Sequence, residues 1–456
     1  MKNFGKYFVW GVATSAYQIE GAHDKDGKGV SIWDSFSNTP GNVMNDENGN
    51  IACDHYHKFE EDINLLSELG VKAYRFSIAW TRILPYGKGE INQKGIDFYN
   101  RIIDLLLEKG ITPWVTLYHW DLPQNLQDEY EGWLGRQIIK DFAYFADVCF
   151  QAFGDRVRHW ITLNEPWVVA ILGYGQAVFP PAITSNSAPY LAGHHLLLAH
   201  AEAVEIYRKK YQKDQGGLIG ITNNCDWREP VDQKSENKEA AERALEFFLG
   251  WFADPVYFGN YPASMIDRVG DRLPSFTEEE KTKLKGSSDF FGLNHYTTMM
   301  VENDDHTIIR EQNVYGNGGI SEDQDVILHT DPAWDKTTMG WSIVPWGCRK
   351  LLLWINQRYG LVDIYITENG CSFDAEVEDG QSHDPGRVEF LKGYLEACDE
   401  AIGEGANLKG YFAWSFLDNF EWALGYSKRF GIVHVDYDTL VRTPKESYYW
   451  YRDFIK

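Results

Sequence analysis

The feature of this chain that most constrains its fold is a series of eight short apolar runs, each followed by a longer stretch with helical periodicity. Several runs are apolar at nearly every position, which is typical of parallel strands covered on both faces. Strand, helix and strand in regular alternation predicts parallel βα units. The runs are Phe8 to Ala13, Ala73 to Ala79, Thr112 to Tyr118, Trp160 to Leu163, Leu218 to Thr222, Phe290 to Leu293, Ile364 to Thr367 and Tyr411 to Phe416.

The stretches between the runs carry helix signals. In Phe59 to Leu69 the apolar residues recur on one face, and Gly70 follows as a helix stop. The stretches Gly95 to Glu108 and Gln137 to Phe153 have the same character and also end close to a glycine. Eight such units predict an α/β fold, a single (β/α)8 TIM barrel over residues 1–456.

The chain is longer than its predicted barrel. A TIM barrel needs roughly 250 residues, whereas this chain has 456. No Pro/Ser-rich linker or repeat divides it, so we expect the surplus in long βα-loop insertions of one catalytic domain. The candidates are Thr14 to His55 and the polar, Gly/Asn/Asp-rich stretch Val301 to Gly340. Such loops would form walls around an active site at the C-terminal face of the barrel.

Composition excludes several partners and indicates a compartment. The 43 basic and 67 acidic residues give a net charge of −24, which argues against a nucleic-acid binder because phosphate binding wants a basic face. No run is long enough for a membrane span. The apolar start contains Gly11 and turns polar at once, so we expect a core strand there and not a secretory signal. Scattered cysteines without a C-x-x-C pair predict free thiols and a cytoplasmic location: Cys53, Cys149, Cys225, Cys348, Cys371 and Cys398.

No cofactor or metal is expected. His194, His195 and His200 lack the spacing of a zinc motif and have no cysteine partners nearby, so they predict helix packing or surface positions. The segment Gly173 to Gly175 is too short for a dinucleotide-binding fingerprint. The oligomeric state is left open.

Two predicted strands end in a glutamate that precedes a residue unfavourable in a strand. The fourth run continues into Glu165 and Pro166, and the seventh into Glu368, Asn369 and Gly370. Either glutamate alone is most simply a solvated surface charge. Strands four and seven lie across the mouth of an eight-stranded barrel, however, so the two carboxyl groups would face each other there.

A facing pair of carboxyl groups is what cleavage of a glycosidic bond requires, because one must protonate the leaving oxygen and the other must attack or stabilise the sugar cation. Other strand ends carry polar and aromatic side chains that suit a sugar pocket. They are Arg75 in the second run, His119 after the third, Asn294 and Tyr296 after the sixth, and the segment WSFLDNFEW at 414–422 after the eighth.

These motifs resemble glycoside hydrolase family 1, the retaining β-glucosidase and β-galactosidase family. The resemblance rests on the N-terminal segment FVWGVATSAYQIEG at 8–21, on TLNEP at 162–166, on ITENG at 366–370 and on the segment ending at Glu421 and Trp422. Their order in a barrel-patterned chain makes the match specific.

The resemblance implies a role for each matching residue. Glu165 would be the general acid/base and Glu368 the nucleophile, while Arg75, Asn294 and Tyr296 would keep Glu368 ionised and aimed. Trp341 would be a platform on the leaving-group side. The complete set implied to bind substrate is Gln18, His119, Trp120, Asn164, Asn294, Tyr296, Trp341, Trp414, Glu421, Trp422 and Phe430.

These roles lead to expectations for the two carboxyl groups. Arg75 and Tyr296 should lower the pKa of Glu368, so that it stays anionic and nucleophilic. Glu165 faces that charge in a partly desolvated pocket, so its pKa should be raised and the group protonated at neutral pH.

The expected activity is that of a retaining exo-β-glucosidase acting on cellobiose, short β-gluco-oligosaccharides or aryl and alkyl β-glucosides, with a role in cellulose degradation. A broad β-galactosidase or β-fucosidase is the alternative, because the same side chains can serve equatorial and axial 4-hydroxyls. A 6-phospho-β-glucosidase is disfavoured because Glu421 would repel a phosphate and Lys428 is a lone cation. A non-catalytic sugar-binding protein is disfavoured because both glutamates are present.

Overall fold

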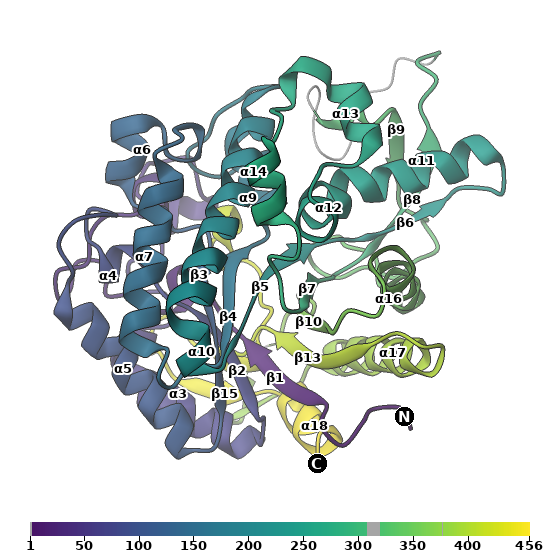
Figure 1. Cartoon of the computed structure of the whole chain (residues 1–456). Helices are drawn as coiled ribbons and strands as arrows, with labels where there is room; N and C mark the ends of the chain where they lie inside the picture. The colour runs from purple at the N-terminus through teal and green to yellow at the C-terminus, as the bar shows by residue number, and fades with distance from the viewer. Residues whose placement is uncertain (1, 308–319, 376) are drawn as a thin grey trace.

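In a computed structural model, which describes residues 2–307, 320–375 and 377–456, the eight predicted runs form one closed parallel barrel (Figure 1). The strand order around the barrel is β1-β13-β10-β7-β5-β4-β3-β2, which is the chain order of the eight runs. The predicted (β/α)8 fold is therefore confirmed. The barrel strands are β1 (Val9–Ala13), β2 (Ala73–Ser77), β3 (Thr112–Tyr118), β4 (His159–Asn164), β5 (Leu218–Asn224), β7 (Phe291–Asn294), β10 (Ile364–Asn369) and β13 (Leu408–Trp414).

Helices surround the barrel and return the chain to the start of each next strand (Figure 1). Their apolar faces pack on the strands, and α3 ends at Gly70 in the left-handed conformation, as the sequence predicts. The helices that follow the eight barrel strands in turn are α3 (His55–Leu69), α5 (Gln93–Glu108), α7 (Ile138–Phe153), α9 (Ala188–Ile206), the series α11 (Ser235–Leu245), α12 (Trp251–Phe258), α13 (Ala263–Val269) and α14 (Glu278–Leu284), then α16 (Pro345–Tyr359), α17 (Pro385–Gly403) and α18 (Glu446–Phe454).

The surplus residues form βα loops, and these loops contain secondary structure of their own. The stretch Val301 to Gly340 was expected to be polar loop, but its first part belongs to β8 (Thr298–Asn303), which pairs with β6 (Trp227–Pro230) and β9 (Val326–His329) in a three-stranded sheet. Residues 308–319 of that stretch lie outside the described residues. Short helices occupy other loops: α1 (Ala16–Ile19), α2 (Ile32–Ser37), α4 (Trp80–Ile83), α6 (Gln124–Tyr130), α8 (Pro166–Val168), α10 (Gln212–Gln215) and α15 (Ile320–Asp323). Two small antiparallel pairs are β11 (Val377–Glu378) with β12 (Gln381–Ser382) and β14 (Val433–Val435) with β15 (Arg442–Pro444).

The two glutamates leave their strands differently. β4 ends at Asn164, and Glu165 follows with a positive φ of 49°, a costly conformation for a residue with a Cβ that is found mainly at functional sites. β10 continues through Glu368 to Asn369, two residues beyond the predicted end. A Cβ on Gly370 would lie 1.6 Å from the carbonyl oxygen of Trp414, so close backbone approach explains this glycine.

β4 and β10 are separated by β5 and β7 on one side and by four strands on the other. Glu165 and Glu368 therefore start from different sides of the barrel mouth, although they are not diametrically opposed.

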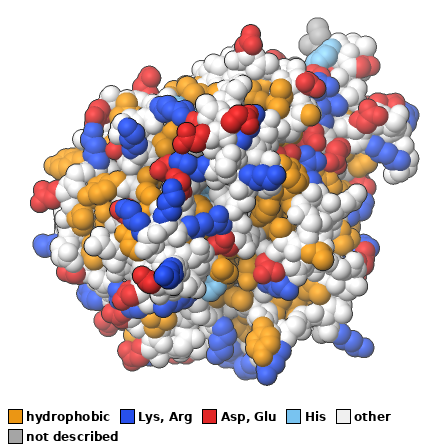
Figure 2. Space-filling view, in the orientation of Figure 1, with side chains coloured by type: hydrophobic (Ala, Val, Ile, Leu, Met, Phe, Trp, Pro, Cys, Tyr) orange, Lys and Arg blue, Asp and Glu red, His pale blue; other side chains and the backbone are white. Residues whose placement is uncertain are grey.

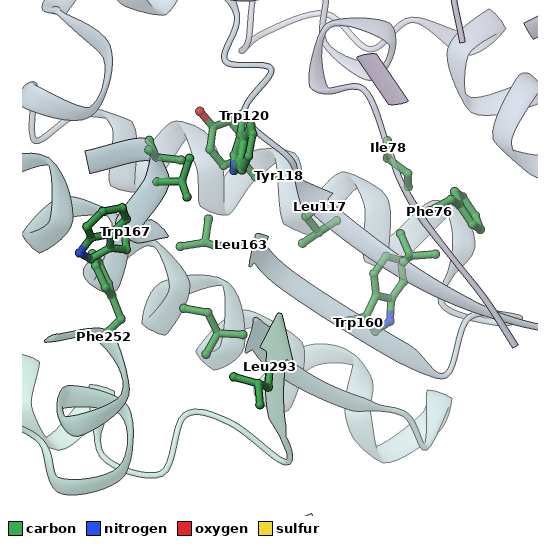
Figure 3. Close-up of a cluster of buried hydrophobic side chains, with 14 of the residues drawn as sticks. Phe76, Ile78, Leu117, Tyr118, Trp120, Trp160, Leu163, Trp167, Phe252 and Leu293 are labelled. Carbon is green, nitrogen blue, oxygen red and sulfur yellow. The ribbon is translucent and has the colours of Figure 1, made fainter. Parts of the chain in front are cut away.

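Two apolar layers hold the fold together. Inside the barrel, a cluster takes side chains from successive strands, among them Ala73, Trp114, Ile161 and Phe412. Between the barrel and the helices lies a larger core, part of which is drawn in Figure 3, where Trp160 and Leu163 of β4 lie near Leu117 of β3. The inner cluster fills the barrel, so a site must lie at one of its ends. In TIM barrels that end is the C-terminal face.

Charge and apolar side chains are mixed on the outside of the molecule. Figure 2 shows acidic and basic groups interspersed over the visible face, with apolar groups scattered between them. None of the helices in the described residues is both long enough and apolar enough to cross a membrane.

Trp114 provides a test of the barrel core. Its ring stacks on His159 at a centroid distance of 4.1 Å and contacts Tyr365 and Phe412 at 4.8 and 5.1 Å. Trp114→Ala should lower the free energy of unfolding by about 3–5 kcal/mol, because it leaves a cavity that the closed barrel cannot fill. Urea denaturation followed by circular dichroism measures the loss. Trp346→Ala, at a tryptophan that is 36% exposed, should cost less than about 1 kcal/mol, and equal losses would contradict this account.

Candidate active site

Arg75 lies at the centre of the barrel mouth and is 1% exposed. Its Nη1 donates to Glu368 Oε1 at 2.6 Å and to the carbonyl oxygen of Thr367 at 3.0 Å. Its Nη2 donates to Asn164 Oδ1 at 2.6 Å, and its Nε to Thr116 Oγ1 at 3.2 Å. One guanidinium group therefore connects β2 with β3, β4 and β10, and it places the Glu368 carboxylate beside the residue that precedes Glu165.

The second oxygen of Glu368 has a partner as well. Tyr296 donates its hydroxyl to Glu368 Oε2 at 2.6 Å. Both contacts that the sequence analysis expects around Glu368, from Arg75 and from Tyr296, are thus present. The carboxylate is held at each oxygen by a charged or short hydrogen bond, which orients it.

Glu165 has a different environment. Asn294 donates its amide to Glu165 Oε1 at 2.6 Å and to Asn164 Oδ1 at 3.1 Å, while Thr367 donates to Asn294 Oδ1 at 2.8 Å. The hydrogen bond of Asn294 to Glu165 adds to its expected role at Glu368, whose pKa Asn294 also acts to lower. No cation contacts Glu165 directly in these hydrogen bonds, so its charged form has less support than that of Glu368.

The pKa values of the two carboxyl groups follow from these surroundings. Burial raises the pKa of Glu165 well above its ordinary range, and the negative charge of Glu368 raises it further against the hydrogen bond from Asn294. Burial also raises the pKa of Glu368, whereas Arg75 and Tyr296 act to lower it.

The expectation of a lowered pKa for Glu368 is therefore wrong in sign. The desolvation of a fully enclosed carboxylate outweighs the support from Arg75 and Tyr296. The pKa of Glu165 is nevertheless raised more than that of Glu368, as expected, because only Glu165 lacks a directly bonded cation. Of the two groups, Glu165 is the one whose surroundings favour the protonated form more strongly.

Two further residues, Glu421 and His119, place polar atoms at the barrel mouth. Glu421 is partly buried, its enclosed Oε2 has no partner in the described part of the chain, and desolvation raises its pKa to about 8. His119 Nε2 faces the amide of Asn164 at 3.1 Å, which places the ring hydrogen on Nδ1, and that atom is buried without a partner among the described residues. Burial and Arg75 lower the pKa of His119, so the ring is neutral. A buried polar atom without a partner is costly unless a ligand satisfies it.

Gln18 lies on the wall next to Glu421. Its side chain is completely buried and bonds to Ser15 and to the loop after β13 through Asn419. The family resemblance implies that Gln18 contacts the sugar but gives no role to Asn419, which lies within the segment 414–422. Asparagine is common in turns, and nothing in the sequence distinguishes it from a turn residue.

The predicted aromatic residues line the same mouth. Trp422 is close to Trp120, with ring centroids 4.5 Å apart, and stacks on His119 at 5.9 Å. Trp414 also stacks on His119, at a centroid distance of 5.9 Å. Trp341 and Phe430 lie together near Tyr296, and their centroids are 6.0 Å apart. Flat rings on two sides of a polar centre fit the faces of a pyranose.

The three histidines on α9 do not enter this site. They are buried and bond to protein groups, as the helix-packing interpretation expects: His194 to Tyr261, His195 to the carbonyl oxygen of Trp133, and His200 to Thr162 and Ser287. Among the described residues, no group of three or more histidine, cysteine, aspartate or glutamate side chains is arranged to hold a metal ion.

Fold and site together define a barrel enzyme that cleaves glycosidic bonds. A glutamate with a strongly raised pKa and a glutamate anchored by Arg75 share the mouth, and polar and aromatic side chains surround them in the pattern that sugar binding requires.

Comparison with known proteins agrees with this class. A profile described as glycosyl hydrolase family 1 matches residues 1–456. β-Glucosidase 42 of Arabidopsis thaliana is 48% identical, over 100% of this chain and 94% of that protein. The crystal structure of the rice Os3BGlu6 β-glucosidase superposes with a TM-score of 0.95 at 46% identity and covers 100% of this chain and 99% of its own. The chain belongs to glycosyl hydrolase family 1.

Two complexes of similar proteins bear on the chemistry. An Os3BGlu6 variant with a glutamate replaced by glutamine was solved in a covalent complex with Glc from GA4GE. The Thermotoga maritima β-glucosidase, 47% identical with a TM-score of 0.91 over 100% of this chain and 99% of its own, was solved with galacto-hydroximolactam.

The coupling of the two glutamates predicts the effect of removing one charge. Because the negative charge of Glu368 raises the pKa of Glu165, Glu368→Gln should lower the pKa of Glu165. Carbon NMR titration of labelled glutamate, with Glu165→Gln for assignment, measures it. Asp226→Asn is the control, since Asp226 raises the same pKa but contributes less than Glu368 and should give the smaller fall. An unchanged or higher pKa in Glu368→Gln would refute the coupling.

Proposed function

We propose that this glycoside hydrolase is a retaining exo-β-glucosidase that releases terminal non-reducing β-D-glucosyl residues from cellobiose, short β-gluco-oligosaccharides or aryl and alkyl β-glucosides. The observation that carries the proposal is that Glu165 and Glu368 differ in their hydrogen-bond partners and in how strongly their surroundings raise the pKa. Glu368 is bonded at both oxygens by Arg75 and Tyr296, while burial and the negative charge of Glu368 raise the pKa of Glu165 well above its ordinary range. One group is ready to attack and the other to donate a proton.

The first step forms a glycosyl ester. A Glu368 oxygen attacks the anomeric carbon, the bond from that carbon to the leaving oxygen breaks, and the proton of Glu165 moves to that oxygen. The positive charge that develops on the sugar lies beside Glu368. Attack converts the carboxylate to a neutral ester, which removes the charge that raised the pKa of Glu165.

The second step hydrolyses the ester. Glu165, now a carboxylate with a lower pKa, accepts a proton from water as the water oxygen bonds to the anomeric carbon and the bond to Glu368 breaks. Two inversions give net retention. The covalent complex of the rice relative supports this route.

The polar atoms without protein partners support a hydroxyl-rich substrate. Glu421 Oε2 and His119 Nδ1 are buried at the mouth, and hydroxyl groups can both donate to the first and accept from the second.

A β-galactosidase or β-fucosidase activity is the second candidate. It is favoured by the galacto-configured ligand of the similar Thermotoga maritima protein. Glu421 can accept from an axial or an equatorial 4-hydroxyl, so both sugars can be substrates of one site.

A phosphorylated sugar is a poorer substrate for this site. Lys428 donates its Nζ to the carbonyl oxygen of Thr338 at 2.6 Å, and Glu421 is an acid. A phosphate would therefore meet the carboxyl group of Glu421, while the amino group of Lys428 is already bonded to the protein.

A panel of aryl β-D-glycosides tests the substrate. We expect the glucoside to have the highest kcat/KM, the galactoside and fucoside to be turned over more slowly, and the glucoside 6-phosphate to be slowest. Proton NMR should show β-glucose as the first product. Glu368→Ala is the matched control and should lower kcat by at least about 1,000-fold. Fastest turnover of the 6-phosphate, or α-glucose as the first product, would refute the proposal.

A cytoplasmic location and a part in the breakdown of cellulose fragments are proposed with this activity. The six cysteines are free and buried, and Cys348 Sγ lies 4.0 Å from Cys398 Sγ, so a reducing compartment would keep this pair as thiols.

The thiols of protein taken from its native cells test the compartment. Alkylation under denaturing conditions without a reductant should label all six cysteines, with a reduced and alkylated sample as the control. A peptide that joins Cys348 to Cys398 would contradict a reducing location.

A further inference from the structure

The side chain of Gln18 is held by other parts of the protein. Its Oε1 accepts from Ser15 at 2.6 Å, and its Nε2 donates to Asn419 Oδ1 at 2.9 Å and to the carbonyl oxygen of Phe420 at 3.0 Å. A side-chain amide has two N–H groups, and both are used here. Gln18 can therefore meet a sugar only through the remaining lone pair of Oε1. The position of that lone pair is set by the loop after β13.

Asn419 can hold the Gln18 side chain because its own side chain is fixed by hydrogen bonds. While its Oδ1 accepts from Gln18, its Nδ2 donates to Ser415 Oγ and to the carbonyl oxygen of Leu417, both at 3.0 Å. The residue is 2% exposed. This position requires a side chain that accepts a hydrogen bond at one atom and donates at another, which aspartate and leucine cannot do.

The loop that carries Asn419 is fixed at the preceding residue. Asp418 is completely buried and accepts from Lys445 Nζ at 2.7 Å, from the backbone N–H of Gly431 at 2.9 Å and from Arg429 Nη1 at 2.7 Å. Buried carboxylates with two cationic partners are costly to disrupt. Asn419 thus follows a residue that two cations and a backbone N–H hold in place.

The same loop continues into the second wall of the pocket. Glu421 follows Asn419 by two residues and has a buried oxygen without a partner in the described residues. Trp422 stacks on Tyr17, the neighbour of Gln18, at a centroid distance of 6.1 Å and an angle of 10°. The backbone N–H of Phe420 also donates to the carbonyl oxygen of Gln18 at 3.1 Å.

We propose that Asn419 is a positioning residue that sets the Gln18 amide relative to Glu421, so that two segments some 400 residues apart in the chain recognise the hydroxyl groups of one sugar as a unit. This inference rests on the proposed function and deepens it. Asn419 does not touch the substrate in this account, and its effect reaches the sugar through Gln18.

Kinetics on deoxy substrates test the inference. Wild type, Asn419→Ala, Gln18→Ala and the double variant are compared on an aryl β-D-glucoside and on its 3-, 4- and 6-deoxy analogues. Asn419→Ala should lower kcat/KM for the glucoside by about 10–100-fold. The double variant should lose less than about 3-fold more than Gln18→Ala alone, because the two changes remove one interaction. On the analogue whose turnover Gln18→Ala leaves unchanged, Asn419→Ala should also have little effect.

A merely structural role would give different results. Equal loss on every analogue, or additive losses in the double variant, would overturn the inference. Asn237→Ala is the matched control: this buried asparagine of α11 donates to Asp232 at 2.8 Å and accepts from the backbone of Asn303 at 2.9 Å, and its loss should leave the ratios between analogues unchanged. If Asn419→Ala does not fold, Asn419→Ser carries the same comparison. Absence of glucoside turnover in the wild type would refute the proposed function instead.

Discussion

The interaction on which the rest of the site depends is the bond between the Arg75 guanidinium and the Glu368 carboxylate. Arg75 is 1% exposed and donates to Glu368, Asn164 and Thr116, side chains from three other strands of the barrel. A buried guanidinium must be paired and bonded at most of its N–H groups, so these strands can approach only in an arrangement that satisfies it. The hydrogen bonds of Arg75 therefore restrict both how the barrel strands come together and where the Glu368 carboxylate lies.

The chemistry follows from the asymmetry that this bond creates. Both glutamates are enclosed, and burial raises the pKa of each. Arg75 and Tyr296 offset that effect at Glu368, whereas the charge of Glu368 adds to it at Glu165. In the proposed mechanism the charge that attacks the sugar adds to burial in raising the pKa of Glu165, and its neutralisation in the ester lets Glu165 act as a base.

Much of this could be predicted from the sequence, because strand patterning and motif order report on topology. The eight strands were located to within a few residues, and Glu165, Glu368, Arg75 and Tyr296 were placed at one mouth. The sign of the pKa shift of Glu368 was wrong, since the depth of burial depends on the inserted loops. The hydrogen bond of Asn294 to Glu165 and the contacts of Asn419 could not be predicted, because they depend on which side-chain atoms meet, and residue type alone does not determine that.

Identification of the residue that becomes bonded to sugar tests the central claim most directly. The protein is incubated with an aryl 2-deoxy-2-fluoro-β-D-glucoside, which slows the second step, then digested and analysed by tandem mass spectrometry. The account predicts a single glycosylated peptide with the sugar on Glu368. An adduct on Glu165, or the release of aryl alcohol with no adduct under conditions where the ester is stable, would contradict it.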